Sequence, residues 1–275
     1  MAIIHHGLRI IFIHNQRCAG TSMSSVLVNS GGEKISTKHC AIGRVKYLVL
    51  DNLITPETFD DYFKFAFVRN PWDRALSLYR YRLNKRRWHA LKGAKGGENP
   101  TRNLSRLERG FEYYMDMIKD GEIKMPKSQA EMTFIEGEQS MDFIGRYESL
   151  HSDWVKAVWM TVEKKLDYLA EDQGLDKLFV IQNIEKLLNS ITFDEDCRKN
   201  AKIKIYGIIT GDKSSIRKAE KILKLPKRNI MKLKFKGVDK EELIKKNYRD
   251  LYTERSRGIV EELYHDDIDE FNYSF

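Results

Sequence analysis

The chain has 275 residues and a formal net charge of +8, and 41% of its residues are hydrophobic. This size and composition favour one large α/β domain, or one domain with an inserted subdomain, with a sizeable core. No stretch of the sequence approaches the roughly 20 apolar residues that span a bilayer. The excess of lysine and arginine either serves solubility alone or favours an anionic partner, such as a nucleic acid, a nucleotide or a sulfated ligand.

The N-terminal segment does not look like a targeting signal. Its apolar run is short, contains histidines and Arg9, and is followed by no small-residue cleavage site. The three cysteines are widely spaced and form no CxxC pair, which argues against disulfides and structural zinc and suits a reducing compartment. We therefore expect a cytoplasmic chain with no metal and no membrane partner.

The first predicted unit is a strand, a loop of small residues and a helix. Residues 8–14 read LRIIFIH, a nearly continuous apolar run that is typical of a strand buried on both faces of a parallel sheet. The loop 15–20 ends this strand, and a helix is predicted from Thr21 to about Asn29. A helix that begins directly after a buried strand points unpaired N–H groups and the positive end of its dipole at one place, which favours an anion site.

The residues of this first loop suit that chemistry. Ala19 and Gly20 let the backbone approach a ligand closely, Thr21 and Ser22 add hydroxyl donors, and Arg17 adds a fixed positive charge. An ATPase phosphate loop would carry a lysine directly after its last glycine, and this loop does not. ATP hydrolysis is therefore disfavoured.

A second unit follows the same order. Residues 62–68 (YFKFAFV) predict a strand, Pro71 suits the first turn of a helix, and the helix is predicted from Trp72 to Arg86. Arg69 leaves the strand end and Ser77 lies two turns along the helix, so together they could hold a second phosphate. Two anion sites at the carboxyl ends of neighbouring strands fit a nucleotide that carries both 5′ and 3′ phosphates.

The rest of the chain gives coarser predictions. Residues 85–106 are basic, rich in glycine and weakly patterned, and predict a mobile loop. Residues 171–241 suggest an accessory helical region for acceptor binding or dimer contact. The remaining predicted elements are a strand at 141–147, helices at 111–119, 149–169 and 248–262, and a packed aromatic tail at 268–275.

Both loops resemble the nucleotide-binding motifs of sulfotransferases that use 3′-phosphoadenosine-5′-phosphosulfate (PAPS), above all the carbohydrate type. Residues 12–22 (FIHNQRCAGTS) are similar to the loop that binds the 5′ phosphosulfate, and residues 65–79 (FAFVRNPWDRALSLY) are very similar to the 3′-phosphate motif. Residues 143–148 and the tail from Tyr264 to Tyr273 also match the family pattern. The resemblance covers roughly residues 8–82, 141–155 and 247–275.

The resemblance implies a fold, a reaction and a set of residues. It implies a three-layer P-loop-kinase-like α/β fold with a central parallel sheet and helices on both faces, formed by residues 1–275 as a single domain. It implies in-line transfer of a sulfuryl group from PAPS, without a metal or a nucleic acid, to a hydroxyl or amine of a saccharide or a small natural product, leaving 3′,5′-bisphosphoadenosine (PAP). The candidate nucleotide-binding residues are Arg17, Cys18, Ala19, Gly20, Thr21, Ser22, Met23, Arg69, Ser77 and Arg146. The protein is expected to be a monomer or a homodimer.

Two positions differ from the family pattern, and the base is inferred separately. Arg17 stands where the family loop has a lysine, and Gln16 where it has a proline. Since arginine stays protonated, Arg17 is expected to act purely through its charge. His39 is the candidate general base, because relatives often carry a histidine between the two loops, although a structural histidine remains the alternative. Arg146 could equally form a structural ion pair.

Two other classes of function remain open from the sequence. The first is a non-catalytic protein that binds a nucleotide or polyanion and keeps the fold, which the arginine at position 17 motivates. The second is a phosphotransferase, which the missing lysine motif disfavours.

Overall fold

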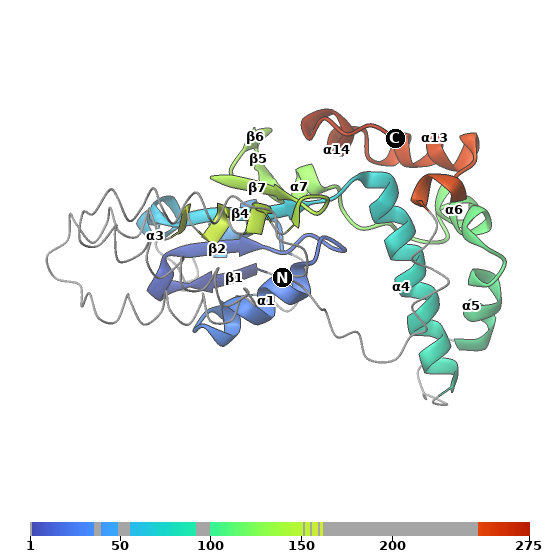
Figure 1. Ribbon diagram of the computed structural model, residues 1–275, viewed down its shortest axis with the longest axis horizontal. Coiled ribbons are helices and arrows are strands. Elements are labelled where there is room, and N and C mark those ends of the chain that lie inside the picture. Colours follow the sequence, from blue (N-terminus) through green and yellow to red (C-terminus); the bar gives the residue numbers. More distant parts are fainter. Residues whose placement is uncertain are drawn as a thin grey trace, which may run out of the picture. The chain divides into compact units, whose positions relative to one another are not determined.

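The computed structural model describes residues 2–35, 40–48, 56–91, 100–150, 152–154, 156–158, 160–161 and 247–275 (Figure 1). The chain divides into two compact units, of which the first comprises Met1–Val68 and Met132–Phe235, and the second Arg69–Glu131 and Lys236–Phe275. The predicted accessory region at 171–241 lies outside the described residues, and so does His39. Among the described residues, no helix is both long and apolar enough to cross a membrane.

The first unit contains a five-stranded, mostly parallel sheet in the order β3-β1-β2-β4-β7. The three strands predicted from sequence are β2 (Ile10–Ile13), β4 (Phe63–Val68) and β7 (Phe143–Arg146), and they pair in parallel as neighbours. The sequence prediction missed β1 (Ala2–His5), which runs antiparallel to β2 and pairs on its other side with β3 (Glu33–Lys34).

The antiparallel strand β1 makes the sheet mixed rather than fully parallel as predicted. Only a short 3-10 turn, His6–Leu8, joins β1 to β2, and Arg9 follows it in the left-handed region with φ 49°. A connection this short can join only antiparallel neighbours, because a parallel pair needs a crossover of a dozen or more residues.

Apolar side chains cover both faces of this sheet, because successive residues of a strand point to opposite sides. One layer joins Ile10 and Phe12 to the helix α1 (Gly20–Asn29), through Met23 and Leu27, and to the helical residues Trp154 and Val158. The other layer joins Ile11 and Ile13 to α2 (Ile42–Leu48) and to Phe59 of α3 (Pro56–Asp61). The first unit therefore has three layers, with the sheet between helices, as predicted.

The second unit is helical and is built around α4 (Pro71–Leu91), α5 (Pro100–Leu107), α6 (Phe111–Lys119), α13 (Glu254–Leu263) and α14 (His265–Glu270) (Figure 1). A short 3-10 helix, Tyr248–Leu251, precedes α13. The helix α7 (Gln129–Thr133) begins in this unit and leads into a small hairpin of β5 (Phe134–Ile135) and β6 (Glu138–Gln139) in the first unit.

Helix replaces much of the loop predicted at 85–106. The helix α4 continues past its predicted end at Arg86 to Leu91, and residues 100–106 belong to α5. The physical reason is local: residues 85–91 contain neither glycine nor proline, while Pro100 occupies the first turn of α5, where its missing N–H is not needed. The glycines that suggested a loop fall within residues 92–99, which lie outside the described part of the chain.

The predicted packing of the aromatic tail is confirmed within the second unit. Phe271 and Tyr273 are buried, and the ring of Phe275 lies 5.6 Å from that of Trp72 and 5.4 Å from that of Tyr252, measured between centroids. The tail also contacts the start of α4 directly, since Asn70 Nδ2 donates to the carbonyl of Ser274 at 3.0 Å.

Candidate functional site

The first candidate loop, residues 14–20, leaves the sheet at the carboxyl end of β2. Asn15 is buried and ties the loop to the neighbouring strand, because its Nδ2 donates to the carbonyl of Phe67 at 3.0 Å. Arg17 and Ala19 both adopt left-handed backbone conformations, with φ of 69° and 58°. Such conformations cost non-glycine residues of order 1 kcal/mol and concentrate at functional sites, so the loop holds a strained, defined shape.

Gly20 is the residue at which α1 meets the end of β2. A Cβ atom placed on Gly20 would lie 2.0 Å from Cδ2 of the buried His14 ring. Any side chain at this position would therefore have to displace the ring or the helix. Because Gly20 has no side chain, the first turn of α1 can pack directly against His14 at the end of β2.

The helix α1 begins without a side-chain cap. Its N-cap residue is Ala19, which makes no side-chain cap hydrogen bond, and its first turn contains no acidic residue. The first N–H groups of an α-helix have no intrahelical acceptor, so this end attracts an anion. Thr21 is exposed and Ser22 is half-buried at the same turn, where hydroxyl donors can add to the backbone donors.

The side chains of Cys18 and Met23 are buried beside the start of α1. Both pack in the apolar layer beneath α1, with Leu27 and the aromatic side chains of β4. The N–H of Met23 already donates to the carbonyl of Ala19, within the helix. Of the predicted binding residues in the first loop, Cys18 and Met23 therefore have a visible packing role.

The second candidate loop has a different construction, because its helix is capped. Asn70 Oδ1 accepts from the N–H groups of Trp72, at 3.1 Å, and Asp73, at 3.3 Å, and Pro71 occupies the first helical position. This is the arrangement that an asparagine N-cap and a first-turn proline favour. Because these two N–H groups already donate to Asn70, an anion at the start of α4 would have to be bound by side chains.

One face of α4 carries charged and polar side chains at helical spacing. Arg69 Nε donates to Asp73 Oδ2 at 2.7 Å, and Ser77 follows Asp73 by one turn. Arg80 follows one turn later, and its Nε is buried with no hydrogen-bond partner among the described residues. Burial lowers the pKa of Arg80, Asp73 raises it and Arg69 lowers it, so both of these charges act on Arg80. An anion beside these arginines would relieve their repulsion.

Arg146 is the last residue of β7, and its backbone is tied to the helical residues that follow. The carboxylate of Asp153 accepts from the N–H of Arg146 at 2.9 Å and from Ser149 Oγ at 2.6 Å. The preceding residue must be glycine, since a Cβ on Gly145 would lie 2.4 Å from the ring of Phe67 on the paired strand. The motif around Arg146 is thus explained by strand packing and by a carboxylate that orders the turn.

Asp153→Asn is expected to destabilise the protein by about 2 kcal/mol at pH 7, because it removes the charge from these hydrogen bonds. Burial raises the pKa of Asp153, but hydrogen bonds from Ser149, the Arg146 N–H and Lys156 outweigh it and lower the pKa overall. A depressed pKa in the folded state stabilises above the unfolded value of about 3.9 and loses that contribution as the pH falls through the folded pKa. Urea unfolding at pH 7 and near pH 3 measures both effects. The difference in unfolding free energy between wild type and Asp153→Asn should be smaller near pH 3 than at pH 7, and an unchanged difference would contradict this account.

One cavity of the first unit lies away from these loops. It has a volume of about 530 Å³ and is lined by Lys46, Lys64, Glu136 and Asp142, among others. Lys64 and Asp142 lie at the amino ends of β4 and β7, whereas the first loop follows the carboxyl end of β2. Lys64 Nζ is already held by the carbonyls of Phe59, Asp60 and Tyr62, so this cavity adds nothing to the candidate site.

The comparison with known proteins identifies the family. The model of the sulfotransferase family matches residues 1–274. The chain belongs to the sulfotransferase family. No curated protein and no solved structure matched this sulfotransferase. Its two candidate loops therefore lie in a chain whose whole length has the sequence pattern of sulfotransferases.

Sequence reasoning missed several residues that order the candidate site. Asn15, Gln129 and Asp267 are all buried polar residues, and their partners are far away in the sequence. Arg80 could have been found from its spacing, since it shares a face of α4 with Asp73 and Ser77.

Among the described residues there is no cluster of three or more side chains suited to a metal ion. His39 lies outside the described residues, next to the buried Cys40, whose thiol pKa burial raises.

Proposed function

We propose that this sulfotransferase uses PAPS as its donor, with the first loop binding the 5′ phosphosulfate and Arg69 and Ser77 binding the 3′ phosphate. The observation that carries the proposal is the parallel pairing of β2 with β4, because the chain leaves two neighbouring strands at the same sheet edge to form the two loops. The parallel strands, the three layers and the site at the strand ends also favour a fold of the P-loop kinase kind.

The residues present fit such a donor at both ends. At the 5′ loop, the uncapped start of α1 offers backbone donors, Thr21 and Ser22 offer hydroxyl groups, and Arg17 offers a charge. At the 3′ phosphate, Arg69 would bind from the residue before the cap of α4, and Ser77 from within the helix. Arg80 is a further candidate ligand, because its buried Nε has no hydrogen-bond partner among the described residues. Arg146, at the end of β7, is proposed as an additional contact to the nucleotide.

The donor supplies an activated sulfuryl group, and the chain supplies position and charge. Arg17 stabilises the negative charge that grows on the oxygen between phosphorus and sulfur, but it gives up no proton, because a guanidinium stays protonated. His39 accepts the proton of the attacking hydroxyl or amine. The proposed acceptor is a saccharide or a small natural product, and the nucleotide product is PAP.

Calorimetry tests the proposal at the level of binding. The protein is expected to bind PAP at least about 100-fold more tightly than AMP, because the 3′ phosphate gains charge-assisted hydrogen bonds from Arg69 and Ser77. Transfer is then tested with ³⁵S-labelled PAPS and a library of saccharides and small hydroxyl and amine compounds. Equal affinity for PAP and AMP would remove the basis of the assignment.

A non-catalytic nucleotide-binding protein is the second candidate function, and the arginine at position 17 favours it. Loss of the family lysine removes the group that can protonate the leaving oxygen. Tight PAP binding without labelled product from a broad acceptor library would favour this second function over the first.

A further inference from the structure

Gln129 is a buried side chain that binds the backbone of Arg69. Its Oε1 accepts from the Arg69 N–H at 2.8 Å, and its Nε2 donates to the Arg69 carbonyl at 2.9 Å. Gln129 has no exposed surface. One amide side chain therefore binds both backbone polar groups of Arg69.

Asp267 holds Gln129 in this position through hydrogen bonds to its backbone and to its side chain. Its Oδ1 accepts from the N–H groups of Gln129, at 2.5 Å, and Ala130, at 2.8 Å, while its Oδ2 accepts from Gln129 Nε2 at 3.1 Å. Burial raises the pKa of Asp267, and Arg74 and these hydrogen bonds lower it, with burial dominating. An amide that contacts a carboxylate must point its NH₂ at it, so Asp267 also fixes the orientation of the Gln129 amide.

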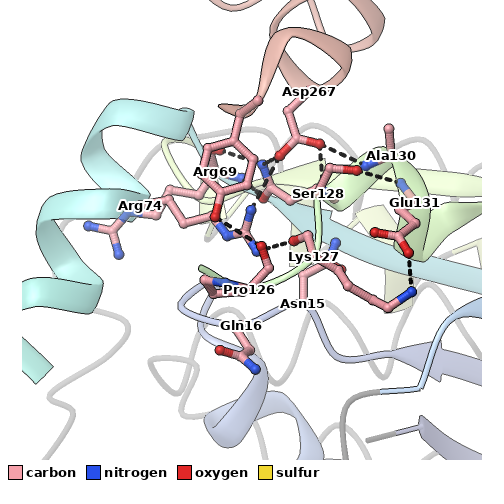
Figure 2. Close-up of polar contacts among 12 residues, drawn as sticks. Asn15, Gln16, Arg69, Arg74, Pro126, Lys127, Ser128, Ala130, Glu131 and Asp267 are labelled. Atoms are coloured by element: carbon pink, nitrogen blue, oxygen red, sulfur yellow. Dashed lines mark hydrogen bonds and ion pairs between the residues drawn. The ribbon is translucent and has the colours of Figure 1, made fainter. Parts of the chain in front are cut away.

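Arg74 completes the network and connects it to α4. Its Nη1 lies 3.3 Å from Asp267 Oδ2, its Nη2 donates to the carbonyl of Lys127 at 2.8 Å, and its guanidinium lies over the ring of Tyr264. Tyr264 in turn donates to the carbonyl of Pro126 at 3.0 Å. The segment 126–130 is thereby held between α4 and α14, as Figure 2 shows.

We propose that Gln129, oriented by Asp267, is a positioning residue for the recognition of the 3′ phosphate, a role that rests on the proposed function of Arg69. Arg69 lies between the end of β4 and the cap residue Asn70, outside any helix or strand. The Gln129 amide bonds to the N–H and to the carbonyl of Arg69, so it fixes the Arg69 backbone at the junction of β4 and α4. Gln129 holds the backbone of Arg69 and Asp73 holds its Nε, so the residue is constrained at both ends of its side chain.

The residue that Gln129 contacts is what distinguishes a positioning role from a purely structural one. A buried glutamine that served only stability could bind any pair of backbone groups, but this one binds the residue whose side chain is assigned to the ligand. The same unit contains a comparable network without that connection: the carboxylate of Glu112 accepts from Thr253 Oγ1, at 2.9 Å, and Ser256 Oγ, at 2.6 Å, at the start of α13. Glu112 provides a matched control.

The test compares the ratio of the AMP dissociation constant to the PAP dissociation constant in four proteins, measured by calorimetry. In Gln129→Met, which keeps the volume but loses every hydrogen bond, the ratio is expected to fall by about tenfold or more, with AMP affinity within about threefold of wild type. In Gln129→Glu the bond from the Arg69 N–H survives, but a carboxylate then faces the Arg69 carbonyl and Asp267. Its ratio is expected to fall as well.

The control and the outcomes separate positioning from stability. Glu112→Gln is expected to lower the melting temperature while leaving the ratio unchanged. Partial unfolding of a variant lowers the binding stoichiometry but not the ratio, so the comparison holds for either Gln129 variant. A wild-type ratio in Gln129→Met or Gln129→Glu would overturn the positioning role while the proposed function stands. A ratio near one in the wild-type protein would overturn the proposed function and this inference with it.

Discussion

Arg17→Ala is expected to lower the turnover of sulfuryl transfer by about 100- to 1000-fold, which is the usual cost of removing one group that stabilises transition-state charge. Arg17 is the cationic residue of the first loop, in a left-handed conformation that the loop imposes. Its side chain is half-buried, so its charge acts in a medium that screens it less than water does. Steady-state kinetics with labelled PAPS and a responsive acceptor measure the loss.

Arg17→Lys is the matched variant, because it keeps the charge and restores the residue type of the family loop. It is expected to retain turnover within about tenfold, since a lysine can both stabilise the leaving oxygen and donate a proton to it. PAP binding in Arg17→Ala should weaken far less than turnover falls, because the charge is needed most where the bond to sulfur breaks. Near-normal turnover in Arg17→Ala would contradict the role.

The elements that sequence reasoning found are those whose signal is local. The β2 and β4 runs are apolar on both faces, and the helix at 111–119 has the same bounds in the structure as in the prediction. Asn70-Pro71 marks the start of α4 through a cap and a first-turn proline, which act within a few residues. The two candidate loops could also be placed at one edge of the sheet, because each follows the carboxyl end of a predicted parallel strand.

The features that sequence reasoning missed depend on contacts between distant parts of the chain. Gln129 and Asp267 are 138 positions apart and look like ordinary polar residues, yet both are fully buried in one network. The strand β1 is short and ends in histidine, and only its pairing with β2 identifies it. The core position of the Met23 side chain was also not predicted, because it depends on the packing of α1 against the sheet.

Arg69→Ala is expected to weaken PAP binding by about 10- to 100-fold while leaving AMP affinity nearly unchanged, because a charge-assisted hydrogen bond to the 3′ phosphate is lost. Part of this loss has a second cause. Arg69 Nε binds Asp73 Oδ2 at 2.7 Å, so removing the guanidinium leaves a carboxylate that repels the phosphate. Titration calorimetry with PAP and AMP measures the two affinities.

The double variant Arg69→Ala/Asp73→Ala separates these two causes. If Asp73 repels the phosphate once Arg69 is gone, the double variant should bind PAP more tightly than Arg69→Ala but less tightly than wild type. Arg106→Ala removes the same charge from an ion pair with Glu122 in the same helical unit, and it should leave the preference for PAP intact. Loss of AMP affinity in parallel with PAP affinity in Arg69→Ala would mean that Arg69 supports the fold rather than the 3′ phosphate.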